Sequence, residues 1–257
     1  MRLGFLGSGN MASALARGIG EPALCFDPVG DRASALATEL GGEAVADAAA
    51  LAERADAVVL GHKPGQLLDA ARDASGARAV VSILGGVPIA DLRAAYPDRP
   101  VVRLMPNTPA GVGKGVVAVA IEAREPGVAA PAGEDELRAE LLGLLARCAT
   151  VVELPESQMA AATAAFGVLP AYVSLFAEAT VDAAIRHGMT PDAAGRMVAA
   201  GIEGSAALLR AQDHDTLAVR RGVTSPGGST ARGLRALDRG GLREAVQDAF
   251  DAAVAVS

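Results

Sequence analysis

The sequence predicts an α/β domain built on a doubly wound, mostly parallel sheet, followed by a second domain made only of helices. Short apolar runs typical of strands alternate with Ala-rich helical segments over residues 1–155, which is the pattern of successive β-α-β units. From residue 156 to residue 257 the strand pattern stops and only helical segments follow. This change places the domain boundary near residue 155.

The elements of the first domain follow from its hydrophobic pattern. Strands are expected at residues 2–6, 23–26, 57–60, 79–84, 101–105, 116–121 and 149–154. Helical periodicity predicts helices over residues 10–19, 31–40, 47–54, 64–74, 89–95 and 134–147. In the second domain, helix breaks are expected near Pro170 and at residues 188–191, 212–215, 225–229 and 240–241, where turn-forming residues gather.

Composition narrows the classes of function. The 257 residues are 51% hydrophobic and 21% charged, which suits a packed core and not a disordered chain. Aromatic residues make up only 3% and Trp is absent, which argues against modules that stack nucleobases on aromatic side chains. The net charge of −7 provides no overall basic field for nucleic acid or anionic lipid. We therefore expect neither nucleic acid nor a membrane as a partner.

The cysteines and the apolar segments bear on the compartment. Cys25 and Cys148 are too few for a disulfide framework and lack the spacing of metal ligands, so no metal site is expected. The first ten residues contain no apolar stretch of signal-peptide length. Residues 157–177 carry no charge and are long enough to span a bilayer. Gly167 and Pro170 interrupt them, so we expect a buried, proline-interrupted helix in a soluble, cytoplasmic protein.

A glycine-rich loop follows the first strand. In FLGSGNMASAL, Gly7 and Gly9 are followed by Ala12 at the third position of the G-x-G-x-x-[GA] pattern. Gly7 permits a tight turn, Gly9 lets a pyrophosphate approach the backbone, and Ala12 keeps the helix close to the strand. The helix N-terminus then faces the phosphate charge. Because the motif lies between a strand and a helix, it predicts a dinucleotide site of Rossmann type.

The residues leave the choice between NAD and NADP open. Asp27 ends the second strand, where an acidic residue normally binds the ribose hydroxyls of NAD. Pro28 follows it, and Arg32 could reach a 2′-phosphate from the next helix. Asp27 and Asp31 are also suited to capping that helix.

Three further segments carry a family resemblance. They are VVLGHKP at 58–64, VRLMPNTPA at 102–110 and VTSPGGST at 223–230. Together with FLGSGNMA, their order and spacing resemble the pyrroline-5-carboxylate reductase family. The resemblance covers essentially the whole chain, including residues 170–189 and 199–209.

The resemblance implies reduction of the C=N bond of 1-pyrroline-5-carboxylate to L-proline, with NADPH as cofactor and NADH possible. It also implies a homodimer, or a larger assembly of dimers, formed by interleaved helices of residues 156–257, which complete the substrate site. The implied cofactor-binding residues are Leu6, Gly7, Ser8, Gly9, Asn10, Met11, Asp27, Pro28, Lys63, Pro64, Asn107 and Thr108. The implied substrate-binding residues are Ser225, Gly227, Gly228, Ser229 and Thr230, and Thr230 and Glu156 are the implied catalytic residues.

Each of these residues also has a structural interpretation. Lys63-Pro64 and the turn that starts at Asn107 fit ordinary turn chemistry. The two glycines before the last-but-one helix would expose backbone N–H groups to a carboxylate, whereas Ser229 or Thr230 could instead cap that helix. Glu156 suits either the product amine or the positive end of a helix dipole.

The chain departs from the family near the expected substrate. Phe166, Val168 and Leu169 stand where the family keeps Ser, Ser and Gly, and Ala48 and Ala160 replace polar residues. We expect a tighter, more apolar pocket. Two other hypotheses therefore remain: a related imine or β-hydroxyacid-type reductase with a different small carboxylated substrate, and a non-catalytic dinucleotide-binding protein.

Overall fold

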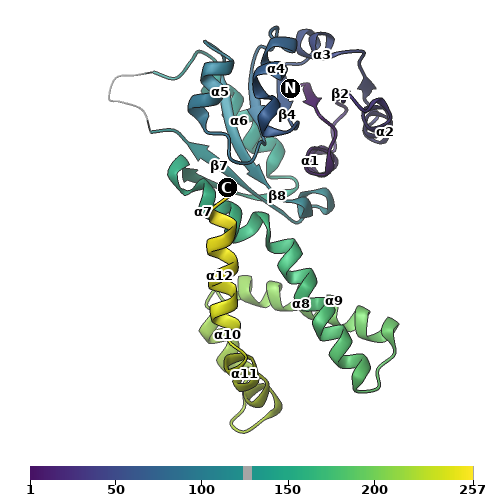
Figure 1. The fold of residues 1–257 in the computed structure, drawn as a ribbon, viewed down its shortest axis with the longest axis vertical. Coiled ribbons are helices and arrows are strands. Elements are labelled where there is room, and N and C mark those ends of the chain that lie inside the picture. The colour runs from purple at the N-terminus through teal and green to yellow at the C-terminus, as the bar shows by residue number, and fades with distance from the viewer. Residues whose placement is uncertain (124–128, 257) are drawn as a thin grey trace. The chain divides into compact units, whose positions relative to one another are not determined.

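The computed structural model of the protein describes residues 1–123 and 129–256. The chain forms two compact units (Figure 1). The first contains Met1–Pro170 and the chain from Ala253 onward, and the second contains Ala171–Ala252. The sheet ends at Pro155, where the sequence pattern changes, but the first unit continues to Pro170.

An eight-stranded sheet organises the first unit, in the order β3-β2-β1-β4-β5-β6-β7-β8 among the described residues. Strands β1 to β6 are parallel to one another, β7 is antiparallel to β6, and β8 is parallel to β7. This confirms the predicted doubly wound, mostly parallel sheet. The strands are β1 (Leu3–Leu6), β2 (Leu24–Phe26), β3 (Glu43–Ala44), β4 (Ala57–Leu60), β5 (Val80–Ser82), β6 (Val101–Pro106), β7 (Gly115–Ile121) and β8 (Ala149–Pro155).

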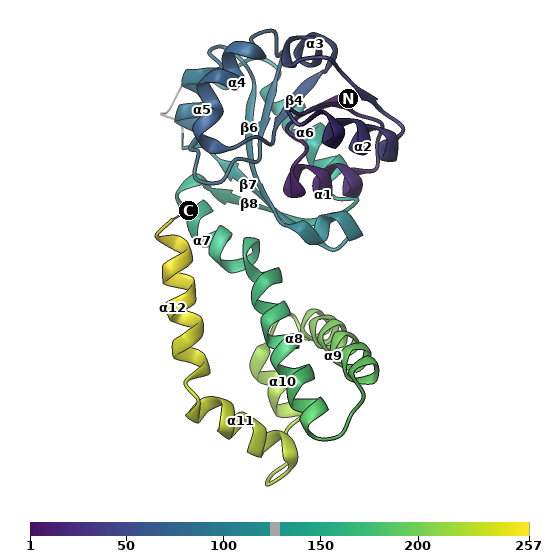
Figure 2. The same cartoon turned by 45° about the vertical axis from the view of Figure 1, so that its right-hand side comes forward.

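Helices cover both faces of the sheet (Figure 1, Figure 2). They are α1 (Asn10–Ile19), α2 (Gly30–Leu40), α3 (Ala48–Arg54), α4 (Leu67–Asp73), α5 (Ile89–Ala95) and α6 (Glu134–Leu145). One buried cluster joins the sheet to Leu15, Leu36 and Leu141 of α1, α2 and α6. The other joins it to α3, α4 and α5 through side chains such as Leu51 and Leu92. Small aliphatic residues therefore fill both halves of the core.

The sequence-based element predictions differ from the structure in a few places. The edge strand Glu43–Ala44 was not predicted, because two exposed residues leave no apolar run. The helix predicted over 64–74 is a 3₁₀ turn, η1 (Pro64–Gln66), followed by α4. Cys25 and Cys148 are both free and buried, and burial raises the pKa of the Cys25 thiol to about 11.

Short helical turns follow β8 and pack on the sheet. They are η3 (Glu156–Gln158), α7 (Met159–Ala162) and a π-helical turn, η4 (Thr163–Gly167). Met159 and Ala162 are buried against Ala118 and Ala120 of β7. This apolar contact explains why the first unit extends beyond the last strand.

The second unit consists of helices, as predicted (Figure 2). They are α8 (Leu169–Arg186), α9 (Pro191–Ala211), α10 (Thr216–Gly222), α11 (Ser229–Arg239) and α12 (Leu242–Val254). Thr190 and Asp215 cap α9 and α10 through their side chains. The Tyr172 hydroxyl donates to the Ala249 carbonyl at 3.2 Å and so joins α8 to α12.

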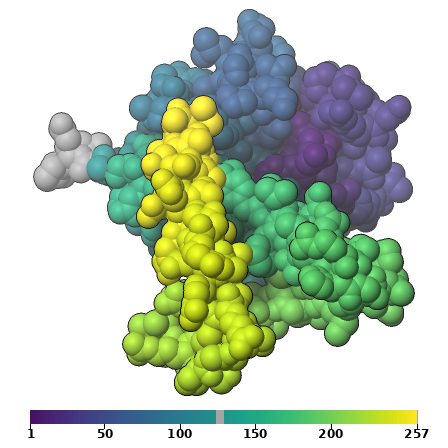
Figure 3. Space-filling view, turned by 60° about the horizontal axis from the view of Figure 1, so that its bottom comes forward, coloured from purple at the N-terminus to yellow at the C-terminus, as the bar shows by residue number. Residues whose placement is uncertain are grey.

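The apolar surface of these helices is left uncovered within a single chain. The segment Glu156–Arg186 is long and apolar enough to cross a membrane by length and composition alone. The expected buried helix is found only in part, because Met159, Ala162 and Ala164 are buried whereas α8 has no buried residue. Leu175 is 66% exposed, Phe176 is 50% exposed, and Figure 3 shows α12, in yellow, open to solvent. Within the part of the chain that the structure describes, these side chains are left without a covering layer.

Candidate active site

The glycine loop begins where β1 ends, between its two neighbours in the sheet, β2 and β4. Gly7 has a φ of +102°, a conformation that disfavours every residue with a Cβ. A Cβ there would lie 2.7 Å from the carbonyl carbon of Gly61. The Gly7 N–H donates to the Phe26 carbonyl at 2.8 Å. The chain can therefore turn here, between the ends of β2 and β4, only with glycine.

The N-terminus of α1 is open next to Gly9. Gly9 is the N-cap residue and has no side chain that could accept a hydrogen bond from the first turn. A Cβ at Gly9 would have no atom within 4 Å. The neighbouring Ser8 hydroxyl is buried and has no hydrogen-bond partner among the described residues. Unpaired N–H groups and open space are what a bound phosphate needs.

Asp27 braces the glycine loop from the end of β2. Its carboxylate is buried and accepts the Ser8 N–H at 2.7 Å and the Val29 N–H at 2.8 Å. Each carboxylate oxygen can accept a further hydrogen bond, so Asp27 could still bind a ribose hydroxyl. That contact stays a prediction. Arg32 lies exposed in the first turn of α2, next to the same strand end.

The loop after β4 supplies a second unpartnered polar atom. His62 Nδ1 lies 2.9 Å from the Lys63 carbonyl, which can only accept, so Nδ1 carries the proton. The His62 Nε2 atom is buried and has no partner among the described residues, and burial lowers the pKa of the ring. Lys63 and Pro64 are exposed at the start of η1.

Asn107 and Thr108 follow β6. Asn107 is 5% exposed, and its side chain bonds to the Val116 N–H and to the Phe166 carbonyl. Thr108 is exposed at the start of η2 (Thr108–Val112). Asn107 therefore takes part in turn structure, while the cofactor-binding role of Asn107 and Thr108 stays a prediction.

These segments meet at one edge of the sheet. Because β1, β2, β4 and β6 are parallel, the loops after them lie at the same carboxyl edge, where α/β sheets bind ligands. The open space at Gly9 and the unpartnered atoms of Ser8 and His62 fit a bound dinucleotide. The edge brings together the predicted residues of the first unit: Leu6, Gly7, Ser8, Gly9, Asn10, Met11, Asp27, Pro28, Lys63, Pro64, Asn107 and Thr108.

Glu156 is held by the protein itself. Its Oε1 accepts the Ile89 N–H at 2.6 Å and lies 2.8 Å from the Arg103 guanidinium. The two side chains are 26% and 12% exposed. Arg103 was not singled out from the sequence, and Glu156 therefore has a clear structural partner while its catalytic role stays a prediction.

The Ser225–Thr230 loop belongs to the second unit. Gly227 has a φ of +71°, and Gly228 is the N-cap of α11, with no side-chain cap. The alternative in which Ser229 or Thr230 caps this helix is therefore wrong, because both lie inside its first turn. Thr230 is exposed. No N-cap side chain accepts from the first turn of α11, and binding of a carboxylate there stays a prediction.

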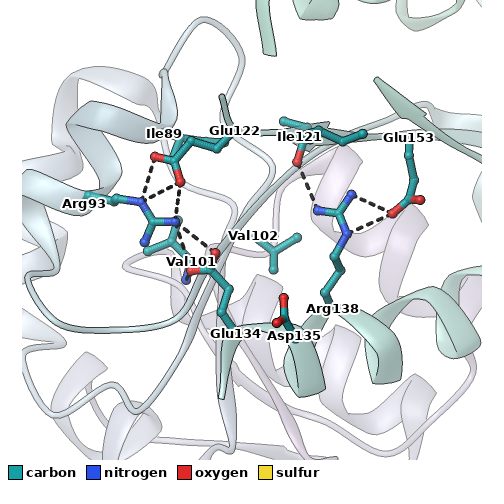
Figure 4. A pocket seen from close by; sticks show the side chains of 11 residues that line it. Ile89, Arg93, Val101, Val102, Ile121, Glu122, Glu134, Asp135, Arg138 and Glu153 are labelled. Atoms are coloured by element: carbon teal, nitrogen blue, oxygen red, sulfur yellow. Dashed lines mark hydrogen bonds and ion pairs between the residues drawn. The ribbon is translucent and has the colours of Figure 1, made fainter. Parts of the chain in front are cut away.

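A cleft of about 300 Å³ lies at the opposite edge of the sheet, where β6 begins and β7 ends. Figure 4 shows Arg93 against Glu122 and Glu134, and Arg138 against Glu153. Glu134 also accepts the Val101 N–H at 3.0 Å. Both arginines of the cleft are therefore paired with carboxylates of the same chain. Within residues 1–123 and 129–256, no cluster of His, Cys, Asp or Glu is arranged to hold a metal.

The fold and the glycine loop define a dinucleotide-binding protein of Rossmann type. A family model described as NADP oxidoreductase coenzyme F420-dependent matches residues 2–86, and one described as pyrroline-5-carboxylate reductase dimerisation matches residues 156–257. The chain is 33% identical to pyrroline-5-carboxylate reductase of Synechocystis sp., over 98% of this chain and 96% of that protein. It is 32% identical to that of Escherichia coli, over 97% and 94%.

Solved structures agree along the whole chain. The 1-pyrroline-5-carboxylate reductase of Streptococcus pyogenes superposes with a TM-score of 0.86 at 26% identity, covering 99% of this chain and 96% of that one. The Plasmodium falciparum pyrroline carboxylate reductase, solved with NADP bound, gives 0.83 at 27% identity, covering 99% and 95%. This chain belongs to the pyrroline-5-carboxylate reductase family, which confirms the resemblance drawn from its motifs.

Proposed function

We propose that this protein reduces 1-pyrroline-5-carboxylate to L-proline with NADPH. One observation carries the proposal: a member of this family keeps both an open dinucleotide loop at Gly9 and an uncapped helix start at Gly228. The first suits a pyrophosphate and the second a small carboxylate, because both present backbone N–H groups at the positive end of a helix.

The residues of the chain would bind and orient more than they would exchange protons. Bound NADPH supplies a hydride for the carbon of the C=N bond. The N-terminus of α1 holds the pyrophosphate, with Asp27 keeping the loop in shape. The first turn of α11 holds the substrate carboxylate, and the Thr230 hydroxyl orients the ring nitrogen or relays its proton. Catalysis then rests on proximity and on exclusion of water.

NADPH is the preferred cofactor in this proposal. Arg32 is exposed one turn from Asp27, at the start of α2, from where its guanidinium can bind a 2′-phosphate. NADH lacks that phosphate and is expected to support slower turnover at equal concentration.

The substrate site is completed in a homodimer, or in a larger assembly of dimers, that works in the cytoplasm. Among the described residues of α8 to α12, only Ala194 is buried, and Met197 is 66% exposed. Such faces need a covering surface, and a second copy of the family's dimerisation domain provides one. We expect light scattering to give at least the mass of a dimer at micromolar concentration. A monomer would contradict the proposal.

Steady-state oxidation of NADPH with 1-pyrroline-5-carboxylate tests the activity. We expect saturable turnover, with L-proline as product and a higher kcat/KM for NADPH than for NADH. Turnover at the background rate, with NADPH binding intact by calorimetry, would overturn the assignment in favour of a different imine or a binding role. A sample unable to bind NADPH would overturn the cofactor site as well.

A further inference from the structure

The side-chain amide of Asn107 joins three segments at the carboxyl end of β6. Its Oδ1 accepts the Val116 N–H at 2.8 Å, and its Nδ2 donates to the Phe166 carbonyl at 3.2 Å. The residue is 5% exposed, so water competes weakly for either bond. A backbone N–H only donates and a carbonyl only accepts, so the partners themselves determine the orientation of the amide.

On the sheet side, the amide oxygen replaces a backbone carbonyl. Facing residues of an antiparallel pair exchange two backbone hydrogen bonds. The Asn107 N–H donates to the Val116 carbonyl at 3.1 Å, but the Asn107 carbonyl accepts the Ala110 N–H at 3.2 Å in the turn that forms η2. Oδ1 takes the return bond from Val116. The β6–β7 pair and the turn carrying Thr108 can therefore both form.

On the helical side, the amide nitrogen replaces an absent N–H. In an α-helix a carbonyl pairs with the N–H four residues later, which for Phe166 would be that of Pro170. Proline has no N–H. The backbone here is already widened, with the Val168 N–H on the Thr163 carbonyl at 3.2 Å, and π turns of this kind are frequent at functional sites.

The side chain of Phe166 holds the same turn by an apolar contact, while its carbonyl bonds to Asn107. Phe166 packs against the buried cluster that contains Ile89, Ala118 and Met159. A Cβ on Gly167 would lie 3.5 Å from Thr163 Cγ2 and 3.6 Å from Met105 Cε, so the backbone runs close to β6. Asn107 Nδ2 is the polar link that ties this turn to the ligand-binding edge of the sheet.

We propose that Asn107 is a positioning residue, whose amide fixes residues 163–168 against the carboxyl edge of β6 and so sets where the imine lies relative to the cofactor. The inference rests on the proposed function, because it takes this edge as the place where the nicotinamide binds. In this proposal the Asn107 side chain bonds to other segments of the protein and not to the dinucleotide.

Asn107→Asp tests the role with little change in shape. The carboxylate keeps an acceptor for Val116 but places a second oxygen against the Phe166 carbonyl. We expect the KM for the imine to rise about tenfold, the scale on which small misplacements act, while kcat and the Kd for NADPH stay within about twofold. General damage to the fold would change all three quantities together.

Pro170→Ala provides the rescue, because it returns a backbone N–H four residues after Phe166. In the Asn107→Asp/Pro170→Ala variant we expect the KM to fall back to within about threefold of the wild-type value. Pro191→Ala is the matched control, since Pro191 lies in the first turn of α9, where its missing N–H pairs with nothing in the helix. It should give no rescue.

A double variant no better than Asn107→Asp would overturn the inference. So would a rise in the Kd for NADPH that Pro170→Ala does not reverse, because Asn107 would then act on the cofactor. If Asn107→Asp alone does not purify as folded protein, we expect the double variant to fold and to unfold at a measurable temperature. A double variant that also fails to fold would equally overturn the inference. The effect of Pro170→Ala on the unfolding temperature of Asn107→Asp can be measured without turnover. This measurement therefore tests the inference even if the protein does not catalyse the proposed reaction.

Discussion

Gly7→Ala should lose about 3 kcal/mol or more of folding free energy, through backbone strain at positive φ together with overlap in a packed site. The added Cβ would meet backbone atoms of Gly61 and His62 at 2.7 to 2.9 Å, and neither is the flexible end of a side chain. The loops after β1 and β4 would have to separate. We expect the unfolding temperature to fall by about 10 °C for a chain of this size, and NADPH binding to be lost with the loop.

Gly9→Ala is the matched control for this result. Gly9 has a φ of −71° and open space around its missing Cβ, so alanine fits the protein. Stability should change by about 0.5 kcal/mol or less, since a weaker N-cap and a stiffer unfolded chain offset each other. The methyl group would occupy the place of the pyrophosphate, and we expect the Kd for NADPH to rise about a hundredfold.

Calorimetric titration with NADPH and thermal unfolding of both variants separate the two roles of the loop. The prediction fails if Gly7→Ala unfolds at the wild-type temperature, or if Gly9→Ala binds NADPH as tightly as the wild type. In the second case the pyrophosphate would not pass over Gly9, and the cofactor site would need another location.

Local patterns explain why the glycine loop and most elements could be predicted from the sequence. The end of a strand, a tight turn and the beginning of a helix all lie within a few residues of Gly7, and each has its own sequence pattern. The breaks at Gly188 and Gly240 likewise depend on nearby residues. The sequence predicted a single helix over 64–74 because Pro64 suits the first turn of either a 3₁₀ segment or an α-helix.

Contacts between distant residues explain what could not be predicted. Asn107 and Phe166 are 59 positions apart, and Ile89 and Glu156 are 67 apart. No periodicity encodes such pairs, although Pro170 signals that a carbonyl four residues earlier needs another donor. Hydropathy also marked α8 as apolar without telling which surface covers it, and the single chain leaves it exposed.

Glu156→Ala should destabilise the first unit by about 3 kcal/mol, because it leaves the Arg103 guanidinium without its partner in a site only 12% exposed. The Ile89 N–H loses its acceptor at the same time, at the start of α5. We expect an unfolding temperature about 10 °C lower. Reduced activity in this variant would therefore not identify a catalytic carboxylate.

Arg103→Met/Glu156→Gln separates stability from chemistry. The glutamine oxygen still accepts from Ile89, and removing both charges leaves none unpaired, so folding free energy should return to within about 1 kcal/mol of the wild type. Arg103 lies in β6 about 10 Å before its carboxyl end by the strand rise, which places the pair away from the predicted cofactor edge. We expect the folded double variant to keep kcat/KM within about threefold. A stable double variant with turnover reduced by two orders of magnitude would contradict this expectation, and would support the catalytic role of Glu156 that the family resemblance implies.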